Sequence, residues 1–230
     1  WEVNKEAPFN ISFLPSVNLY PRNNFQNQKE LLTFVQAIQP KIIYCSGWMD
    51  KEYSSVARNF RNTIPTIVGL DNQWRGTMKQ RIAILLSRIT LLQNFSHCWV
   101  PGPSQQKYAS KLGFKKNNIL TGFYTCDFNF FHSLYLNNRH SKQKSFPKRF
   151  IYVGRYYEFK GINDLWQAFI QLQSEAPNDW ELWCLGTGDI TPIEHPQIKH
   201  FGFIQPAELP KYISQTGVFV LPSRFEPWGV

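Results

Sequence analysis

The sequence predicts an α/β protein made of two units, each with a parallel sheet covered by helices. Short apolar runs alternate with stretches of helical periodicity along most of the chain. The runs are too continuously apolar for strands with one solvent-exposed face. Such runs are typical of parallel strands that are buried on both sides. A polar, basic stretch interrupts the alternation near the middle, and the pattern then restarts.

The first half contains four expected strands and the helices that connect them. Pro40 ends the first helix, and Gly113 ends the helix that Ser104 can cap. In the longest helix, apolar residues recur at three-and-four spacing, which predicts one buried face made of Ile82, Leu85, Leu86, Ile89 and Leu92. The expected elements are a helix at 28–38, a strand at 41–47, a helix at 51–62, a strand at 66–70, a helix at 77–92, a strand at 97–100, a helix at 104–112 and a strand at 117–125.

Residues 134–149 are polar and basic without periodicity, so we expect a linker there. This divides the chain into a first domain at 1–133, the linker, and a second domain at 150–230. The second domain's expected elements are a strand at 149–154, a helix at 162–175, strands at 180–186 and 198–204, a short helix at 207–214 and a strand at 217–222.

The formal net charge of +9 favours anionic partners, which include phosphorylated small molecules, nucleic acid and an anionic membrane surface. The cysteines form no CxxC pair, so we expect buried free thiols in a reducing compartment. The histidines show no metal-ligand spacing, and His195 and His200 are expected at the surface. The sequence shows no secretory signal and no apolar run approaching the roughly 18 residues that span a bilayer.

Ligands of open parallel sheets bind beyond the carboxyl ends of the strands, so the three loops after the second domain's strands should converge. In "VGRYYEFKG", Gly154 allows a turn, and Arg155 and Lys160 offer two cations for a diphosphate at the start of the next helix. A solvated basic loop explains these residues equally well.

The other two loops supply weaker features. "LGTGDI" lacks the third glycine of a dinucleotide fingerprint, so Gly186 and Gly188 indicate either a tight turn that approaches a nucleobase or merely a turn. In "SRFEPWGV", Ser223 precedes Glu226, which can accept hydrogen bonds from sugar hydroxyls, and backbone N–H groups near Trp228 and Gly229 can donate to the same ligand. Glu226 can instead simply favour the following helix dipole.

Together these segments carry a resemblance to a known family. "FIYVGRYYEFKGINDLWQAF", "LGTGD" and "VFVLPSRFEPWGV" resemble, in order and spacing, the donor-binding domain of family-four, or group-one, glycosyltransferases. The segment "HCWVPGPSQQKYASKLGFKKNNILTGFYTCDFNFF", with Asp127 and Phe131, looks like the end of the family's acceptor domain. The resemblance implies a GT-B architecture, in which two Rossmann-like domains face a cleft, here with both domains incomplete.

The resemblance also implies roles for individual residues. Arg155 and Lys160 would bind the donor diphosphate and stabilise the charge on the leaving group without a metal ion or cofactor. Glu226 would lie near the donor sugar, and the family's second glutamate would fall beyond Val230. Many family members have a histidine in the loop where this chain has Asp71, so Asp71 is either an acceptor-side hydrogen-bond partner or base, or a turn that caps the next helix.

The implied reaction is transfer of a sugar, with retention of configuration, from a nucleotide-diphosphate sugar to a hydroxyl acceptor in glycan, polysaccharide or glycolipid synthesis. Other readings are a nucleotide-sugar epimerase or phosphorylase of the same fold, or a basic nucleic-acid-binding module, which no motif supports. We expect a carbohydrate or lipid-linked acceptor, no nucleic-acid partner, and a cytoplasmic location compatible with peripheral contact at the inner face of the membrane. We also expect a chain truncated at both ends, with little activity of its own.

Overall fold

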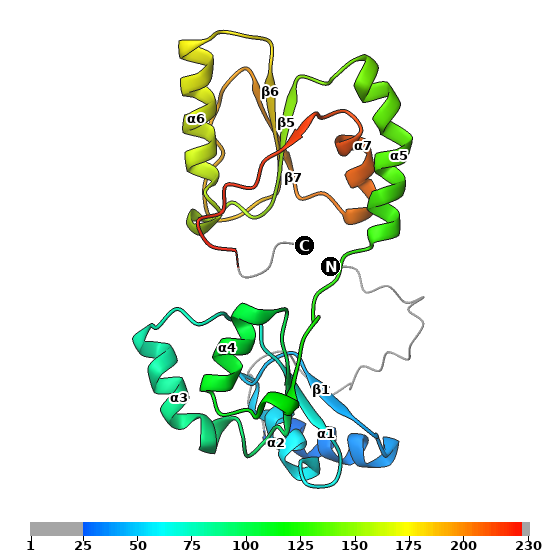
Figure 1. Cartoon of the computed structure of the whole chain (residues 1–230), viewed down its shortest axis with the longest axis vertical. Coiled ribbons are helices and arrows are strands. Elements are labelled where there is room, and N and C mark those ends of the chain that lie inside the picture. The colour runs from blue at the N-terminus through cyan, green and yellow to red at the C-terminus, as the bar shows by residue number, and fades with distance from the viewer. Residues whose placement is uncertain (1–24, 227–230) are drawn as a thin grey trace. The chain divides into compact units, whose positions relative to one another are not determined.

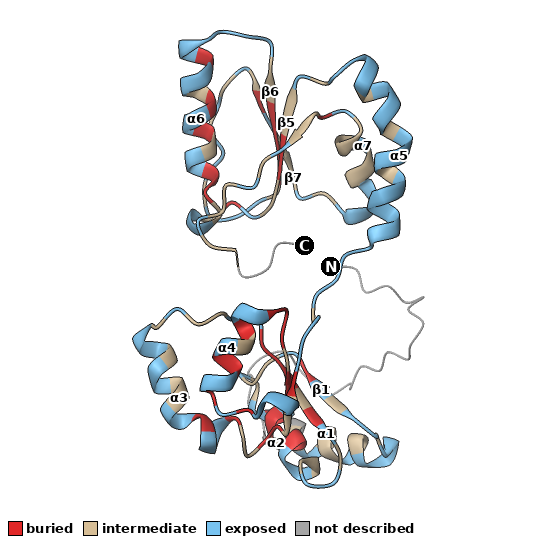
Figure 2. Ribbon diagram, viewed as in Figure 1, coloured by how far each residue is buried: buried red, intermediate tan, exposed pale blue. Residues whose placement is uncertain are grey.

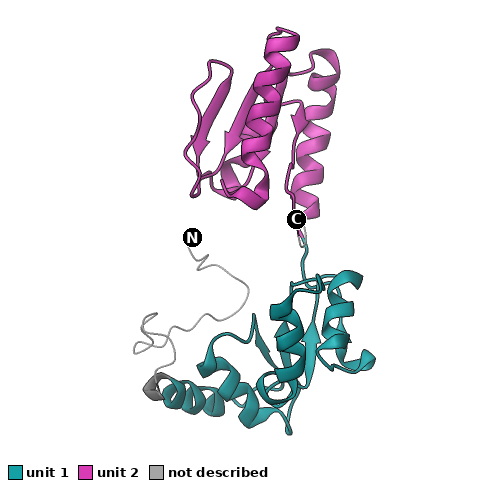
Figure 3. Ribbon diagram, turned by 90° about the vertical axis from the view of Figure 1, so that its left-hand side faces the viewer, with its two compact units in different colours: residues 1–125, 230 teal, residues 126–229 magenta. Residues whose placement is uncertain are grey.

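A computed structural model describes the backbone of residues 25–226 and the side chains from residue 28 onward. The chain divides into two compact units, with the division between Thr125 and Cys126 (Figure 3). Unit 1 is the part up to Thr125, and unit 2 is the part that follows. The division therefore comes earlier than the domain boundary expected at residue 133.

Unit 1 is a parallel four-stranded sheet with the strand order β1-β2-β3-β4, so neighbours in the sequence are neighbours in the sheet. Each step from one strand to the next passes through a helix. The last step also includes a 3-10 turn at Lys116–Asn118. The elements, shown in Figure 1, are α1 (Phe25–Ile38), β1 (Ile43–Cys45), α2 (Lys51–Phe60), β2 (Thr66–Gly69), α3 (Met78–Thr90), β3 (His97–Trp99), α4 (Pro103–Lys111) and β4 (Ile119–Leu120).

The helices of unit 1 begin and end at residues that suit those positions. The Thr77 hydroxyl accepts a hydrogen bond from the Gln80 backbone N–H and caps α3. Gly102, rather than the expected Ser104, is the N-cap of α4, and Pro103 takes the first helical position, where its missing N–H costs nothing. Gly113 follows α4 with a φ of 100°, as predicted for a glycine stop.

The buried face of α3 differs from the sequence prediction. Ala83 and Ile84 pack against the core of unit 1, and Leu91, just after the helix, is fully buried within it. The predicted apolar stripe is instead exposed, and the outer side of α3 is pale blue in Figure 2. The period of the pattern was right, but a shorter apolar row on the other side of the helix makes the contact. Of the predicted row, only Leu92 packs against the core, and the exposed members are Ile82, Leu85, Leu86 and Ile89.

Unit 2 is a second parallel sheet with the strand order β7-β6-β5-β8. The chain builds outward from β5 to β6 and β7, and then returns to place β8 on the other side of β5. Because the strand order reverses direction between β5 and β8, the carboxyl ends of these two strands form a topological switch point. The elements are α5 (Phe128–Lys144), β5 (Arg149–Val153), α6 (Ile162–Glu175), β6 (Glu181–Leu185), β7 (Ile198–Gly202), α7 (Leu209–Ile213) and β8 (Val218–Phe219), with 3-10 turns at Glu158–Lys160 and Pro206–Glu208. The predicted α/β class with two parallel sheets is confirmed.

The linker expected at 134–149 is largely the helix α5. The Asp127 carboxylate caps this helix by accepting a hydrogen bond from the Phe130 N–H. None of the helix residues is buried, so no apolar stripe marked it in the sequence. One strong contact is the Lys142 ammonium, which donates to the carbonyl oxygens of Ile213 and Thr216 at 2.6 and 2.7 Å. Lys142 thus joins α5 to the carboxyl end of α7.

His200, which was expected at the surface, is half-buried and packs against the core of unit 2. Its imidazole lies edge-on to Trp166 and bonds to the Tyr156 hydroxyl at 3.1 Å. Burial lowers the pKa of His200, and a hydrogen bond to the Ile193 carbonyl opposes that effect only in part. His200 is therefore a packing residue. Cys184 is buried in the same cluster, and Cys45 and Cys98 are buried in unit 1, as expected of free thiols, whereas Cys126 is exposed.

Charged side chains tie the amino ends of three neighbouring strands together in unit 2. Arg149 of β5 and Lys199 of β7 both form ion pairs with Glu181 of β6, and the Trp183 indole donates to the same carboxylate. Burial alone would raise the pKa of Glu181, but the bonds from Lys199, Arg149 and Trp183 outweigh it and hold the pKa at about 2. Because the folded pKa is depressed, this contribution to stability is present above pH 4.5 and is lost as the pH falls toward 2.

We predict that Glu181→Gln lowers the free energy of unfolding of unit 2 by about 1–3 kcal/mol at neutral pH, because it removes charged hydrogen bonds. The difference from the parent should shrink as the pH falls toward 2, where the parent's carboxylate is also neutralised. Urea unfolding followed through hydrogen exchange of β5 and β6 amides measures it. Glu175→Gln, at the exposed end of α6, should have little effect at any pH, and an equal loss for Glu181→Gln at both pH values would contradict this account.

Candidate functional site: three loops at one sheet edge

Backbone hydrogen bonds join the loop after β5 to the loop after β6. The Gly154 N–H donates to the Leu185 carbonyl at 2.9 Å, and the Tyr156 N–H donates to the Thr187 carbonyl at 3.0 Å. Tyr156 and Gly188 also form an isolated parallel bridge. The two loops thus continue the pairing of their strands past the sheet edge, so their positions are fixed relative to each other.

The glycines of "LGTGD" are explained by this close packing of backbones. A Cβ atom at Gly186 would lie 1.8 Å from the Gly154 carbonyl oxygen, and one at Gly188 would lie 2.4 Å from the Tyr156 carbonyl oxygen. Side chains at either position would force the loops apart. The glycines therefore form a tight turn whose backbone lies against the neighbouring loop.

The loop after β8 packs against the loop after β5 from the other side. The Arg224 N–H donates to the Phe159 carbonyl at 3.0 Å. Gly161 has a φ of 68°, and a Cβ atom there would lie 2.2 Å from the Pro222 carbonyl oxygen. Only glycine suits both the backbone conformation and this contact. The three loops predicted to converge do so, on both sides of β5.

Lys160 and Glu226 meet at this junction. The Lys160 ammonium lies 2.5 Å from the Glu226 carboxylate, and the Ser223 hydroxyl donates to the same carboxylate oxygen at 3.1 Å. Both charged side chains are mostly buried, with exposed fractions of 20% and 24%. The helix α6 begins at Ile162, so its amino end lies beside Lys160. A cation, a carboxylate, a hydroxyl and a helix N-terminus are thus placed together.

Arg224 is a residue of this region that the sequence analysis missed. Its guanidinium forms two hydrogen bonds with the Asp164 carboxylate, at 2.8 and 2.9 Å, and a third with Glu158 at 3.3 Å. These contacts hold the loop after β8 against the start of α6. All three side chains are exposed, so each ion pair contributes little free energy of folding. The two parallel hydrogen bonds with Asp164 nevertheless fix the orientation of the guanidinium. The spacing along the chain gave no sign of it, because the partners lie far apart in the sequence.

Arg155 lies in the same loop as Lys160 but is differently placed. Its side chain is exposed, and its guanidinium lies 5.9 Å from the centre of the Tyr157 ring. Its carbonyl oxygen accepts a hydrogen bond from the buried Tyr152 hydroxyl at 2.8 Å, which fixes the turn that begins at Gly154. Burial, together with the nearby Cys184 and Glu226, raises the pKa of Tyr152 to about 12, so the hydroxyl stays protonated as a donor.

Two of the expected donor-binding residues, Trp228 and Gly229, lie outside the described residues. Within residues 25–226, no group of three or more histidine, cysteine, aspartate or glutamate side chains is arranged to hold a metal ion. Over the same range, no helix combines the length and the apolar character needed to cross a bilayer.

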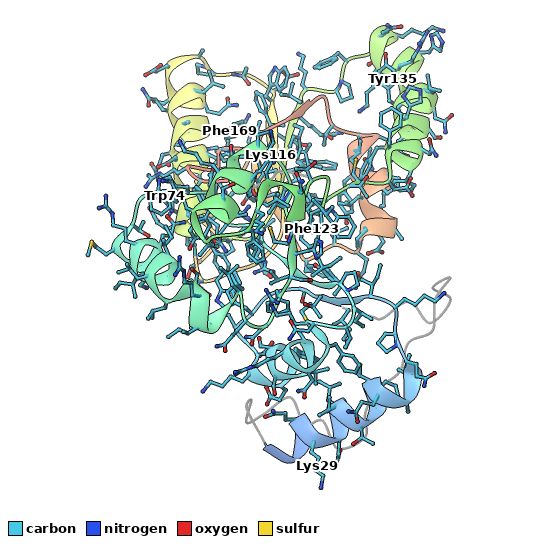
Figure 4. All side chains as sticks on the ribbon, turned by 60° about the horizontal axis from the view of Figure 1, so that its bottom comes forward. Lys29, Trp74, Lys116, Phe123, Tyr135 and Phe169 are labelled. Atoms are coloured by element: carbon cyan, nitrogen blue, oxygen red, sulfur yellow. The ribbon has the colours of Figure 1, made fainter. Side chains whose placement is uncertain are left out.

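Unit 1 places Asp71 beside aromatic side chains at the carboxyl edge of its own sheet. Asp71 is exposed, and it accepts hydrogen bonds from the Asn72 amide at 3.2 Å and the Tyr124 hydroxyl at 3.4 Å. Phe123, labelled in Figure 4, packs against Tyr124 and Tyr44 with ring centres 4.6 and 5.8 Å apart. Thr77 caps α3, so the alternative role of Asp71 as the cap of that helix is not adopted.

Two tryptophans that follow strands of unit 1, Trp48 and Trp74, are partly buried and pack against its core. Trp74 also stacks at a tilt on Tyr108, and the Lys111 ammonium lies 4.9 Å from the centre of its ring. Packing therefore accounts for both.

The second unit is similar to a known family. Residues 147–230 match the family model described as glycosyl transferases group 1. Its glycine turn, its Lys160 loop and its Glu226 loop are the segments that carried the resemblance. No curated protein matches the chain significantly.

Solved structures share the fold at low sequence identity. HepE from Anabaena, in complex with UDP and glucose, aligns over 88% of this chain and 57% of its own, with a TM-score of 0.59 and 15% identity. A glycosyltransferase from Rickettsia africae aligns over 86% and 55%, with a TM-score of 0.58 and 13% identity. The catalytic domain of starch synthase IV from Arabidopsis thaliana, bound to ADP and acarbose, aligns over 88% and 56%, with a TM-score of 0.56 and 12% identity. The chain thus spans about half the length of the solved structures that it matches.

We predict that Gly161→Ala destabilises unit 2 more than Gly202→Ala. Both glycines have a positive φ, of 68° and 71°, so both variants carry the left-handed strain of about 1–2 kcal/mol. Only the Gly161 variant also drives a methyl group into the Pro222 carbonyl, whereas a Cβ at Gly202 meets nothing within 4 Å. We expect an extra loss of about 1–3 kcal/mol in urea unfolding and faster hydrogen exchange at the Arg224 amide. Equal losses for the two variants would show that the loop contact is unimportant.

Proposed function

We propose that this chain is the nucleotide-sugar-binding part, with a portion of the acceptor side, of a retaining glycosyltransferase. The observation that carries the proposal is the junction of Lys160, Glu226 and Ser223 at the switch point of the second sheet. Ligands of open parallel sheets bind at such points. The match of residues 147–230 to the group 1 glycosyltransferase model supports the same reading.

In this proposal Lys160 and Arg155 hold the diphosphate of the donor. Lys160 is paired with Glu226, but an ammonium has three donors, so it can keep the carboxylate and also bind a phosphate oxygen. Arg155 is exposed and can turn its planar fork toward a second phosphate. The N–H groups at the start of α6 add further donors for an anion.

Glu226 and Ser223 then face the donor sugar, where a carboxylate held by a lysine can accept hydrogen bonds from hydroxyl groups. Trp228 and Gly229 would donate backbone N–H groups to the same ligand. Gly154, Gly186 and Gly188 let the loops after β5 and β6 pack closely together, and in this proposal the paired loops form the surface that the nucleoside contacts. The structures of HepE with UDP and of starch synthase IV with ADP leave the choice of base open.

The transfer itself needs charge stabilisation at the leaving group. The bond between the sugar's anomeric carbon and the diphosphate oxygen breaks, and a bond from that carbon to the acceptor oxygen forms. The acceptor's proton passes to the departing phosphate on the same face, so the configuration is retained. Lys160 and Arg155 stabilise the negative charge that develops, a role that this proposal assigns without a metal ion.

The acceptor side of the proposal rests on Asp71 and its aromatic neighbours. Tyr44, Phe123 and Tyr124 form an apolar wall next to a carboxylate, a combination that suits a sugar ring with its apolar face and its hydroxyl groups. This favours a carbohydrate or lipid-linked acceptor, used in glycan, polysaccharide or glycolipid synthesis. An assay of the products separates transfer from the alternative chemistries, because an epimerase releases an altered donor and a phosphorylase consumes inorganic phosphate.

We predict that the chain binds a nucleoside diphosphate and that Lys160→Ala weakens this binding about tenfold to a hundredfold. One charged hydrogen bond contributes about 1.5–3 kcal/mol, and tenfold in affinity corresponds to about 1.4 kcal/mol. Isothermal titration with UDP, ADP and GDP is the measurement.

Lys148→Ala is the matched control, because Lys148 is an exposed lysine that pairs with Asp179 just before β5, at the opposite end of the strand. It should bind like the parent. Failure of the parent to bind any of the three nucleotides, or equal binding by Lys160→Ala, would contradict the proposal.

A further inference from the structure

The exposed stripe of α3 is a continuous apolar surface on unit 1. Its members are separated by three or four residues, so they share one side of the helix. Their exposed fractions are high for large apolar side chains, which are normally covered when they occur together. They are Met78 at 70%, Ile82 at 51%, Leu85 at 79%, Leu86 at 45% and Ile89 at 63%.

Cations line both edges of this stripe. With 3.6 residues per turn, Lys79 falls beside one edge, and Arg81 and Arg88 fall beside the other. All three are exposed, and α3 contains no aspartate or glutamate. An apolar face bordered by cations on a helix without acidic residues is the pattern of helices that lie in the interface of a bilayer.

A pocket with three arginines adjoins the carboxyl end of the stripe. It has a volume of about 410 Å³ and is lined by Arg58 in the last turn of α2, by Arg61 just after that helix, and by Arg88 of α3. Asn62, Leu92 and Gln93 complete the lining, so none of the described residues that line the pocket carries a carboxylate. Arg61 bonds to the Leu92 carbonyl and the Asn62 amide oxygen, which leaves the positive charge of the pocket unbalanced. Such a pocket suits a phosphate group.

The net charge of the protein is concentrated in this same unit. Residues 25–125 contain thirteen lysines and arginines but only four aspartates and glutamates, whereas residues 126–230 contain ten of each. The excess of +9 therefore comes from unit 1. An anionic surface therefore attracts unit 1, whereas unit 2 has no net charge to contribute to the attraction.

We propose that the α3 face of unit 1 docks on an anionic lipid bilayer. The stripe from Met78 to Ile89 enters the boundary between headgroups and acyl chains, and the pocket of Arg58, Arg61 and Arg88 takes a lipid phosphate. The charge of the unit favours this occupant over a second copy of the chain, because two such faces brought together would repel each other. It also goes beyond the proposed sugar transfer, since no residue of the Lys160 site takes part.

Co-sedimentation of the whole chain with vesicles tests the proposal. Vesicles of phosphatidylcholine with about one third phosphatidylglycerol are compared with vesicles of phosphatidylcholine alone. The parent should bind the anionic vesicles and lose most of that binding at high salt, where surface charges are screened. Leu85→Ser should weaken the partition coefficient at least about tenfold, because it removes a large apolar side chain from the contact. Arg58→Ala and Arg88→Ala should each weaken it about fivefold.

Two matched controls should bind like the parent. Leu172→Ser changes an exposed leucine of α6, and Lys144→Ala removes an exposed cation of α5. The residues changed in unit 1 are exposed as well, and circular dichroism should show all variants folded. No binding of the parent to anionic vesicles, or equal binding by Leu85→Ser, would overturn the proposal. So would a dimer that Leu85→Ser abolishes, or tighter binding to an RNA oligonucleotide that Leu85→Ser leaves unchanged.

Discussion

The arrangement of unit 2 depends on one pairing, the parallel alignment of β8 beside β5. It sets Val218 opposite Phe150 and Phe219 opposite Ile151. Because the chain reaches β8 only after it has built β6 and β7 on the other side, loops distant in the sequence leave the sheet as neighbours. The pairing thereby brings Glu226 to Lys160. Without this pairing, the loops that carry Lys160 and Glu226 would lie apart, and both charged side chains would be exposed to water.

The charges of the junction also balance each other. The Lys160–Glu226 pair is mostly buried, so each charge satisfies the other and neither is left unpaired in a low-dielectric setting. A diphosphate that binds Lys160 would add a second anion to the same ammonium. Arg224, bonded to Asp164, keeps the loop in place while that happens. Gly161, Gly186 and Gly188 also hold the site together, because they let the backbones of the three loops approach where side chains would separate them.

The sequence predicted the features of the fold and the candidate site that depend on local pattern. Strand–helix alternation gave both parallel sheets, and the rule for sheet edges brought the three loops together. It did not predict contacts between distant residues, such as Lys160 with Glu226 or Arg224 with Asp164. Periodicity also gave two wrong predictions. The apolar row of α3 is exposed, because Ala83, Ile84 and Leu91 make the contact with the core of unit 1. The segment of α5 was predicted to be a linker, because a helix with no buried side needs no apolar stripe. His200 looked like a surface residue, since nothing in its neighbours showed the partners Tyr156 and Trp166.

The central claim is that the loops after β5, β6 and β8 form a single ligand site. Hydrogen exchange with and without a saturating nucleoside diphosphate tests it most directly, because it reports each loop separately. The account predicts slower exchange in all three segments, 154–161, 186–189 and 222–226, while the turns at the opposite edge of the sheet, before β5 and β6, stay unchanged. Protection confined to unit 1, or to the turns at the opposite edge, would contradict it.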